Sequence, residues 1–287
     1  MEPDLVVVNY DIRDAWYGIA FPSRTAVVDF LFHPKAAFWA DHHPTAFPNS
    51  AAAAAFRSEG ETSIYDPSAK SCAGLLQHWL DGRGHAESRF SELAEWAQKI
   101  DSASYDSVEE SFSLSAPALT LSAALVDASG SQCISIVQRL GSRSLADVAA
   151  DPDLVARANR NHELNAQGLA IVKDSLHVRR SGIAVFSVDP AGARINRYSA
   201  FWFARDARYS AGLVTDSNGT HLSVMRNPWE HFESVHLGKL CSRFGGGGHQ
   251  RVGAIRFRRE ERFQAHGVLS AVVEAIEAAE ARVALHG

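Results

Sequence analysis

Short runs of apolar, mostly β-branched residues that stop at polar residues constrain the fold of this chain most strongly. Leu5 to Asn9 and Ala26 to Leu31 are two such runs, and Phe38 to Ala40 is a shorter third. Continuous apolar runs of this length are typical of strands buried on both faces of a parallel sheet. Helical periodicity follows them in Ala69 to Leu80 and in Glu87 to Ile100. This alternation predicts an α/β fold.

A long helical stretch from Asp151 to Asp174 precedes a change of pattern. Beyond it we expect a helix at Val235 to Phe244 and strands at Ile183 to Val188, Arg197 to Ala204, Tyr209 to Thr215, His221 to Met225 and Val252 to Phe257. The sequence therefore predicts a parallel-sheet domain with flanking helices over residues 1–125. A helical connector over 126–175 would join it to a smaller α/β domain with a mixed sheet over 176–287.

Composition favours a soluble, cytoplasmic protein without a membrane partner. Hydrophobic residues make up 46% of the chain and charged residues 21%, and no apolar run approaches the roughly 18 residues that a membrane span needs. The N-terminus is acidic at Glu2 and Asp4, where an export signal would be basic. Three widely spaced cysteines favour a reducing compartment over a disulfide framework.

The charges are distributed unevenly along the chain. Residues 176–263 hold 14 Lys and Arg against 7 Asp and Glu, although the whole chain has a net charge of -5. A basic surface beside a cleft would attract a phosphorylated ligand, and acidic groups elsewhere would suit a cation. Ordinary solvated surface is the alternative explanation, and charge alone does not decide between the two.

Two acidic positions follow neighbouring predicted strands. Asp29 comes directly after one strand, and Asp41, His42 and His43 follow the next. Ligands of open parallel sheets bind at the carboxyl ends of the strands, so these four side chains would share one crevice. Carboxylate and imidazole together suit Mn²⁺ or a similar cation, which activates water and neutralises phosphate oxygens. A plain polar turn is the alternative reading of the triplet.

A second unusual segment is a run of four glycines, flanked by Arg243 and Arg251. Glycine costs backbone entropy, so such a run usually serves a positive φ or a close approach of the main chain. Exposed amides there would cradle an anion, and a flexible surface loop is the alternative. Arg226 would pair with a phosphate and Trp229 would stack on a base or pack internally. The predicted substrate-binding residues are Arg226, Arg243, Gly245, Gly246, Gly247, Gly248 and His249.

Together these two segments resemble the motifs of a known family. The triplet Asp41-His42-His43 is similar to the signature of the DHH phosphoesterases, and RFGGGGHQRVG, from Arg243 to Gly253, is similar to the GGGH motif of their DHH-associated domain. The order and separation of the motifs also match. The resemblance covers nearly the whole chain and implies a metal-dependent hydrolase of phosphate esters.

The resemblance also implies roles for single residues. Asp29 matches the strand-end aspartate that bridges two metals, and His42 matches a ligand of the second metal. Asp101 matches the last metal-binding aspartate. His43 would face the scissile phosphate as a catalytic residue, and Asp41 would orient the neighbouring histidine. The implied cofactor is Mn²⁺, with Mg²⁺ as the alternative.

The family's first metal motif, His-x-x-x-Asp-x-Asp, has no counterpart here. Asn9, Arg13 and Ala15 stand where His, Asp and Asp are needed, and Asp106 is only a weaker substitute for Asp101. Either the given chain starts downstream of its natural start, which we favour, or the first metal has been given up.

We expect hydrolysis of a small nucleotide or short single-stranded oligonucleotide by metal-activated water. Two alternatives stay open: a catalytically impaired nucleotide-binding or regulatory protein, and a pyrophosphate or polyphosphate hydrolase. A homodimer is compatible with the sequence, which does not fix the oligomeric state.

Overall fold

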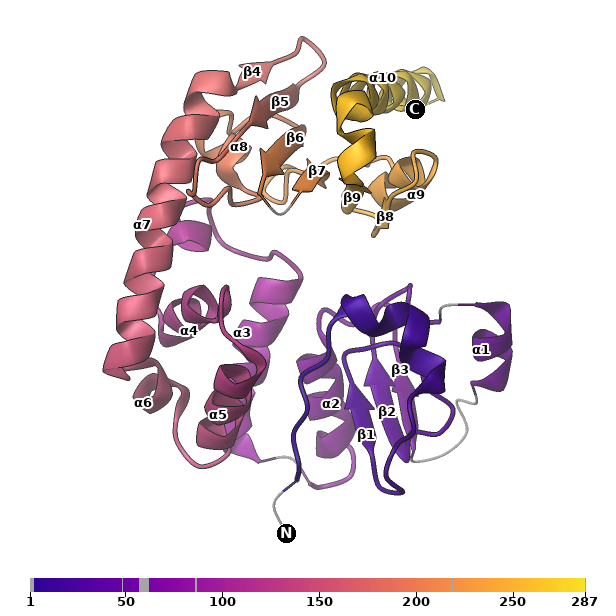
Figure 1. Ribbon diagram of the computed structural model, residues 1–287, viewed down its shortest axis with the longest axis vertical. Coiled ribbons are helices and arrows are strands. Elements are labelled where there is room, and N and C mark those ends of the chain that lie inside the picture. Colours follow the sequence, from indigo (N-terminus) through magenta and orange to yellow (C-terminus); the bar gives the residue numbers. More distant parts are fainter. Residues whose placement is uncertain (1–2, 48, 57–61, 86, 218, 287) are drawn as a thin grey trace. The chain divides into compact units, whose positions relative to one another are not determined.

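The computed structural model describes residues 3–47, 49–56, 62–85, 87–217 and 219–286. The chain divides into two compact units (Figure 1). The N-terminal unit comprises Met1–Tyr105 and Leu125–Pro152, and the C-terminal unit comprises Asp106–Ala124 and Asp153–Gly287. Each unit contains two separate segments of the chain, so the boundaries of the units differ from those of the three consecutive regions expected from the sequence.

The N-terminal unit combines a small sheet with short helices. Its elements are the 3-10 helices η1 (Tyr10–Gly18) and η2 (Ser88–Phe90), the strands β1 (Ala26–Val28), β2 (Phe38–Asp41) and β3 (Ser63–Tyr65), and the helices α1 (Ser50–Ala55), α2 (Cys72–Asp81), α3 (Ser91–Asp101), α5 (Gly130–Leu140) and α6 (Leu145–Ala149). The three strands are all parallel, in the order β1-β2-β3. This confirms the parallel sheet expected from the apolar runs.

Aromatic residues fix the end of this sheet. Trp39 of β2 is buried and donates its indole N–H to the Phe30 carbonyl at 2.8 Å. Trp16 of η1 donates to the Leu31 carbonyl at 3.1 Å. The segment after β1 is therefore tied to both η1 and β2, which holds the backbone at Asp29 in a defined position.

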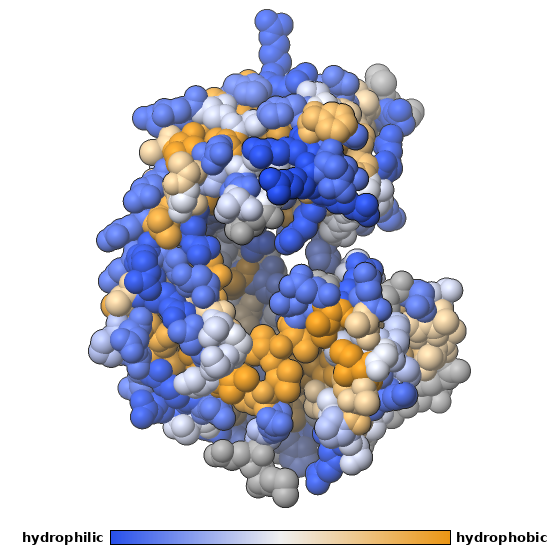
Figure 2. Space-filling view, in the orientation of Figure 1, coloured by the Kyte–Doolittle hydropathy of each residue, from blue (hydrophilic) through white to orange (hydrophobic). Residues whose placement is uncertain are grey.

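The strand expected at Leu5 to Asn9 does not form. This segment has no strand assignment, and Val6 and Val7 are 77% and 50% exposed. Apolar side chains gather on the surface around it (Figure 2). Its β-branched residues favour a strand, but a strand also needs a neighbour to pair with, and the sequence pattern does not show whether one is present.

The C-terminal unit is built on a six-stranded mixed sheet. Its elements are η3 (Glu110–Phe112), α4 (Pro117–Leu125), α7 (Pro152–Ser175), β4 (His177–Val178), β5 (Ile183–Val188), α8 (Ser199–Phe203), β6 (Tyr209–Asp216), β7 (Gly219–Arg226), α9 (Leu237–Ser242), β8 (Gly247–Gly248), β9 (Val252–Phe257), η4 (Arg259–Gln264) and α10 (Ala265–His286). The strand order is β4-β5-β6-β7-β9-β8, and only β5 and β6 run parallel.

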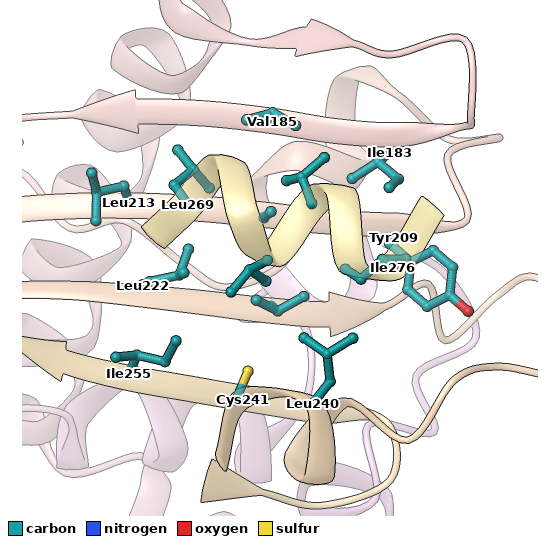
Figure 3. Close-up of a cluster of buried hydrophobic side chains, with 14 of the residues drawn as sticks. Ile183, Val185, Tyr209, Leu213, Leu222, Leu240, Cys241, Ile255, Leu269 and Ile276 are labelled. Carbon is teal, nitrogen blue, oxygen red and sulfur yellow. The ribbon is translucent and has the colours of Figure 1, made fainter. Parts of the chain in front are cut away.

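One face of this sheet is covered by helices α9 and α10. Strand residues such as Leu213, Leu222 and Ile255 alternate toward these helices and pack against Leu269 and Ile276 (Figure 3). Each of these residues is at least nine-tenths buried, and burial of such side chains stabilises a fold by roughly 1.5–3 kcal/mol apiece. The mixed sheet with its helices confirms the expected α/β fold of this half.

The strand predicted at Arg197 to Ala204 is a helix, α8. Tyr198, Ala200 and Phe201 are all buried there, so the run is apolar without alternation. A short buried run of this kind does not reveal its type by periodicity, and tertiary packing decides it. In the part of the chain that the structure describes, no helix combines the length and apolar character needed to cross a bilayer.

Candidate functional site

The carboxyl ends of β1 and β2 bring the predicted polar residues together. Asp29 directly follows β1 and donates its amide to the Ala40 carbonyl of β2 at 2.9 Å. Its φ of 57° lies in the left-handed region, which few residues other than glycine adopt and which aspartate tolerates better than most. Asp41 is the last residue of β2 and is 1% exposed. The two carboxylates therefore meet at one edge, as expected.

Four side chains converge at this edge. One ligand atom from each of Asp29, Asp41, His42 and His43 lies within 4.8 Å of the others. Among the described residues this group does not include Asp11 or Asp14, the acids nearest to the N-terminus. Asn9, in the position where the resemblance requires histidine, accepts the Asp11 amide at 3.0 Å and so caps η1.

The ring of His42 is held so that one nitrogen faces the carboxylates. Its Nδ1 lies 3.0 Å from the Ala69 carbonyl, and because a carbonyl can only accept, Nδ1 carries the proton of this bond. Nε2 is buried without a hydrogen-bond partner. It lies 3.1 Å from Asp101 Oδ2, outside hydrogen-bond geometry, and 3.6 Å from Asp29 Oδ1. Nε2 is thus close to one carboxylate oxygen on each of two elements, although Asp101 is not a member of the four-residue group.

Asp41 orients the other histidine. Its Oδ1 accepts the ring Nδ1–H of His43 at 2.7 Å and also the backbone amides of His42 and His43 at 2.7 and 3.2 Å. The carbonyl of His43 accepts the Tyr65 hydroxyl of β3 at 3.3 Å. Asp41 is consequently a positioning group, and its side chain fixes which nitrogen of His43 remains for other contacts.

Asp101 comes from another element. It is the last residue of α3, and its side chain is 42% exposed. The structure thus brings Asp101 to His42, as the sequence predicted. Asp106, the weaker substitute, donates its amide to Glu110 at 2.6 Å within a different local arrangement.

Electrostatics at the edge raise the pKa values of both histidines and of Asp29. The approach of Asp101 raises the pKa of His42 to about 9, against the opposing effect of burial. The hydrogen bond that the His43 ring donates to Asp41 raises the pKa of His43. Burial raises the pKa of Asp29, and His43 lowers it in turn. A divalent cation would take the place of the proton on His42 and relieve the crowding of the carboxylates.

Two supporting groups were not anticipated from the sequence. The Ala69 carbonyl, which sets the His42 ring, is a main-chain atom and has no residue-type signal. Cys72 at the start of α2 donates Sγ–H to the Ala40 carbonyl at 3.4 Å, and burial raises its pKa to about 12. Cys72 is therefore a neutral thiol that packs behind the cluster.

The cluster fits a divalent cation. His42 presents a buried imidazole nitrogen, without a well-aligned hydrogen bond, to carboxylate oxygens of Asp29 and Asp101, while the opposite ring nitrogen donates to a carbonyl. A histidine that binds a metal in place of a proton is oriented in this way. A mixed oxygen and nitrogen donor set suits Mn²⁺. The residues that would hold it are Asp29, His42 and Asp101.

The glycine run forms a tight hairpin between α9 and β9, which we call the glycine hairpin (residues 245–251). Gly245 and Gly248 have φ values of 80° and 138°, as the sequence suggested. The close approach is to the protein itself: a Cβ at Gly238 of α9 would lie 2.2 Å from the Gly248 carbonyl oxygen, and one at Gly246 would lie 2.2 Å from the Ala254 oxygen. The glycines therefore let three segments pack together.

Several amides of the glycine hairpin point inward. Gly245 donates to the Ser242 carbonyl, Gly246 donates to Cys241 at 3.0 Å, and His249 donates to Val252 at 2.8 Å. The expected cradle of exposed amides therefore does not extend to these three groups. Any contact with an anion would fall to other groups of the hairpin and to exposed side chains such as Arg243.

Arg226 is turned into the protein. It is 8% exposed, donates to the carbonyls of Asn227 and Phe232 at 2.8 and 3.0 Å, and stacks 4.4 Å from the Phe232 ring. This placement argues against the phosphate contact expected of Arg226. Trp229 packs edge to face against Tyr198 at 5.7 Å, which is the internal role weighed for it.

Comparisons with known proteins identify the fold. No protein-family model matches the chain, and no curated protein matches it either. The structure is similar to that of the pGpG-specific phosphodiesterase PggH from Vibrio cholerae, with a TM-score of 0.68 and 14% identity over 93% of this chain and 89% of that one. An exopolyphosphatase-related protein from Bacteroides fragilis matches with a TM-score of 0.48 and 14% identity, over 95% of this chain and 77% of that one. The chain thus has the α/β fold of PggH over nearly its whole length.

Proposed function

We propose that this protein hydrolyses a phosphate ester in a small nucleotide or short oligonucleotide, using water activated by a divalent cation, preferably Mn²⁺. The observation that carries the proposal is the buried Nε2 of His42, which has no hydrogen-bond partner and lies 3.1 and 3.6 Å from two carboxylate oxygens. A divalent cation there would supply a nucleophilic water and neutralise phosphate charge.

The residues of the site divide the work. Asp29, His42 and Asp101 hold the cation. His43 donates its Nδ1–H to Asp41, and this bond raises its pKa and so favours the protonated ring. That ring can donate a proton from Nε2 to a phosphate oxygen as charge develops on it.

Two independent features support a phosphorylated substrate. The fold is that of PggH, a pGpG-specific phosphodiesterase. In addition, residues 176–263 carry an excess of arginine and lysine over acids, which favours an anionic ligand. A linear dinucleotide such as pGpG is therefore the first substrate to test, ahead of longer single strands.

The test compares substrates and metal dependence directly. The protein is incubated with Mn²⁺ and pGpG, a short single-stranded oligonucleotide, a 3',5'-bisphosphonucleoside or pyrophosphate, and the products are separated by chromatography. We expect nucleotide release that stops with a chelator and in Asp29→Ala, while His85→Ala, an exposed histidine of the same unit, behaves as wild type. Release of phosphate from pyrophosphate alone would instead favour the pyrophosphate hydrolase.

A second candidate function is nucleotide binding without turnover. It is favoured by Asn9, which caps η1 in the position where the family motif places a ligand. Two-metal activation would then be lost while one cation remained bound. Tight binding of pGpG without product under all metal conditions would select this alternative.

A further inference from the structure

The C-terminal sheet has a second face with a different character. Alternation along β6 sends Ala211 and Leu213 toward the helices, whereas Ser210 and Gly212 face the opposite side. On β7 and β9, Ser223 and Ala254 face that side too, because they are cross-strand partners. This second face is made of small and polar residues at its centre.

A cavity of about 440 Å³ lies on this face. Its volume falls within the roughly 300–1,000 Å³ typical of small-molecule sites. Gly212 lies at the bottom of the cavity, where it has no side chain to fill the space. The Phe186 ring packs directly on its backbone, with ring carbons 2.1–2.6 Å from where a Cβ would be. Val214 and Ala254 supply further apolar lining. A flat, shallow floor of this kind suits a planar ring.

The rim of the cavity carries positive charge. Arg256 of β9 stands beside His221 of β7 as its cross-strand partner, and Arg197 approaches from the loop before α8. Both arginines are exposed, and His221 is exposed at its surface while neighbouring groups partly desolvate its ring. Burial lowers the pKa of His221, so the two arginines provide the charge at neutral pH and His221 provides a neutral hydrogen-bonding ring. Asp216 is the acidic residue of the lining, and its carboxylate accepts the Gly219 amide at 3.1 Å.

The charged rim of this cavity is not part of the glycine hairpin, although Ala254 of the floor pairs with Gly247 of the hairpin. Thr220 pairs with Phe257 at the cavity end of β7 and β9, whereas Met225 pairs with Val252 at the hairpin end. Five residues of strand separate the two ends, which corresponds to roughly 16 Å at 3.3 Å per residue. His221 and Arg256 of the rim therefore lie toward the end of the sheet away from Met225 and Val252.

We propose that this cavity binds a nucleoside monophosphate, with the base on the floor formed by Gly212, Phe186 and Ala254 and the phosphate between Arg197 and Arg256. Guanidinium groups bind phosphate through paired, charge-assisted hydrogen bonds. The hydroxyls of Ser210 and Ser223 offer polar partners for a base edge or ribose. Such a site would make the C-terminal unit responsive to free nucleotide independently of any chemistry elsewhere.

The experiment is titration calorimetry of the full chain with AMP, in the presence of a chelator so that no cation supports other binding. We expect one AMP to bind, with adenosine and inorganic phosphate each about tenfold weaker or more, since each lacks one half of the interaction. Arg256→Ala should weaken AMP about tenfold or more, and Ala254→Leu, which fills the floor, should do the same by sterics.

Two matched variants keep the test decisive. Arg180→Ala removes an exposed arginine of the same unit that does not line the cavity, and it should leave AMP affinity unchanged. Arg243→Ala tests the glycine hairpin instead. The proposal is overturned if wild type fails to bind AMP at millimolar concentration, or if Arg243→Ala weakens binding while Arg256→Ala and Ala254→Leu do not. Circular dichroism confirms that each variant is folded.

Discussion

The polar cluster at the ends of β1 and β2 and the glycine hairpin after α9 were both singled out by sequence, but their polar groups are used differently. In the cluster, Asp41 and Ala69 orient two imidazoles, and a buried nitrogen of His42 is left facing carboxylates. In the hairpin, amides such as that of Gly246 donate to neighbouring main chain. A buried polar atom without a hydrogen bond needs an explanation, and beside two carboxylates a cation supplies one, whereas the paired amides of the hairpin hold its own backbone together.

The sharpest way to break this comparison is His42→Ala. We expect Mn²⁺ affinity to fall by about 100-fold or more, because the variant removes the only nitrogen of the proposed donor set. The thermal midpoint of the metal-free protein should change little by comparison. Calorimetric titration of Mn²⁺ measures the effect, and unchanged affinity would refute the proposed ligands.

The hairpin should respond in the opposite sense, through stability. In Gly238→Ala a Cβ would meet the Gly248 carbonyl at 2.2 Å, so we expect a loss of about 2–4 kcal/mol in unfolding free energy. Gly267→Ala is the matched control, because it is also helical but has nothing within 4 Å. Higher helix propensity should make it slightly more stable, by about 0.5–1 kcal/mol.

Urea denaturation compares the two glycine variants, and Mn²⁺ titration should give wild-type affinity for both. If Gly238→Ala were as stable as Gly267→Ala, the close packing of α9 on the hairpin would be wrong.

The pH dependence of stability tests the role of His42 in the polar cluster. The pKa of His42 is raised to about 9 in the folded, metal-free protein, above its ordinary value near 6.5. Its stabilising contribution, on the order of 2 kcal/mol, is therefore fully present below pH 6.5 and is lost as the pH rises toward 9. Saturating Mn²⁺ should remove this dependence, since the cation replaces the proton. Denaturation curves with and without Mn²⁺ between pH 6 and 9 would reveal parallel slopes if His42 were not involved.

The smallest effect is expected from Asp41→Asn. An amide can still accept the His43 ring proton but no longer holds a positive charge on it, so the pKa of His43 should fall. We expect turnover to drop about tenfold, with Mn²⁺ affinity nearly unchanged. The pH dependence of turnover, compared with wild type, separates this effect from a loss of folding.

The sequence predicted those features that depend on residues close together in the chain. The strand at Val252 to Phe257 and the convergence of Asp29 with His42 both follow from apolar runs ending at polar residues. It failed at Leu5 to Asn9 and at Arg197 to Ala204, where the outcome depends on whether a partner strand or a packed interior is available. It also missed β3, whose three residues are too few to form a pattern.

Within the candidate site, residue types were predictable but orientations were not. Nothing in the sequence indicates that the carbonyl of Ala69 sets the ring of His42, because main-chain acceptors are the same in every residue. Arg226 illustrates the converse: its charge suggested a ligand, but the Phe232 ring and two carbonyls satisfy it. Such choices are made by long-range packing, which periodicity does not encode.

The left-handed backbone at Asp29 restricts how this position can change over evolutionary time. Glycine, asparagine and aspartate are the residues that accept such a conformation readily, and of these only aspartate carries a negative charge. Descendants that abandon cation chemistry should therefore drift to asparagine or glycine here, rather than to alanine or serine. The residue at this position would then distinguish, from sequence alone, homologues that bind a cation from homologues that have lost the site.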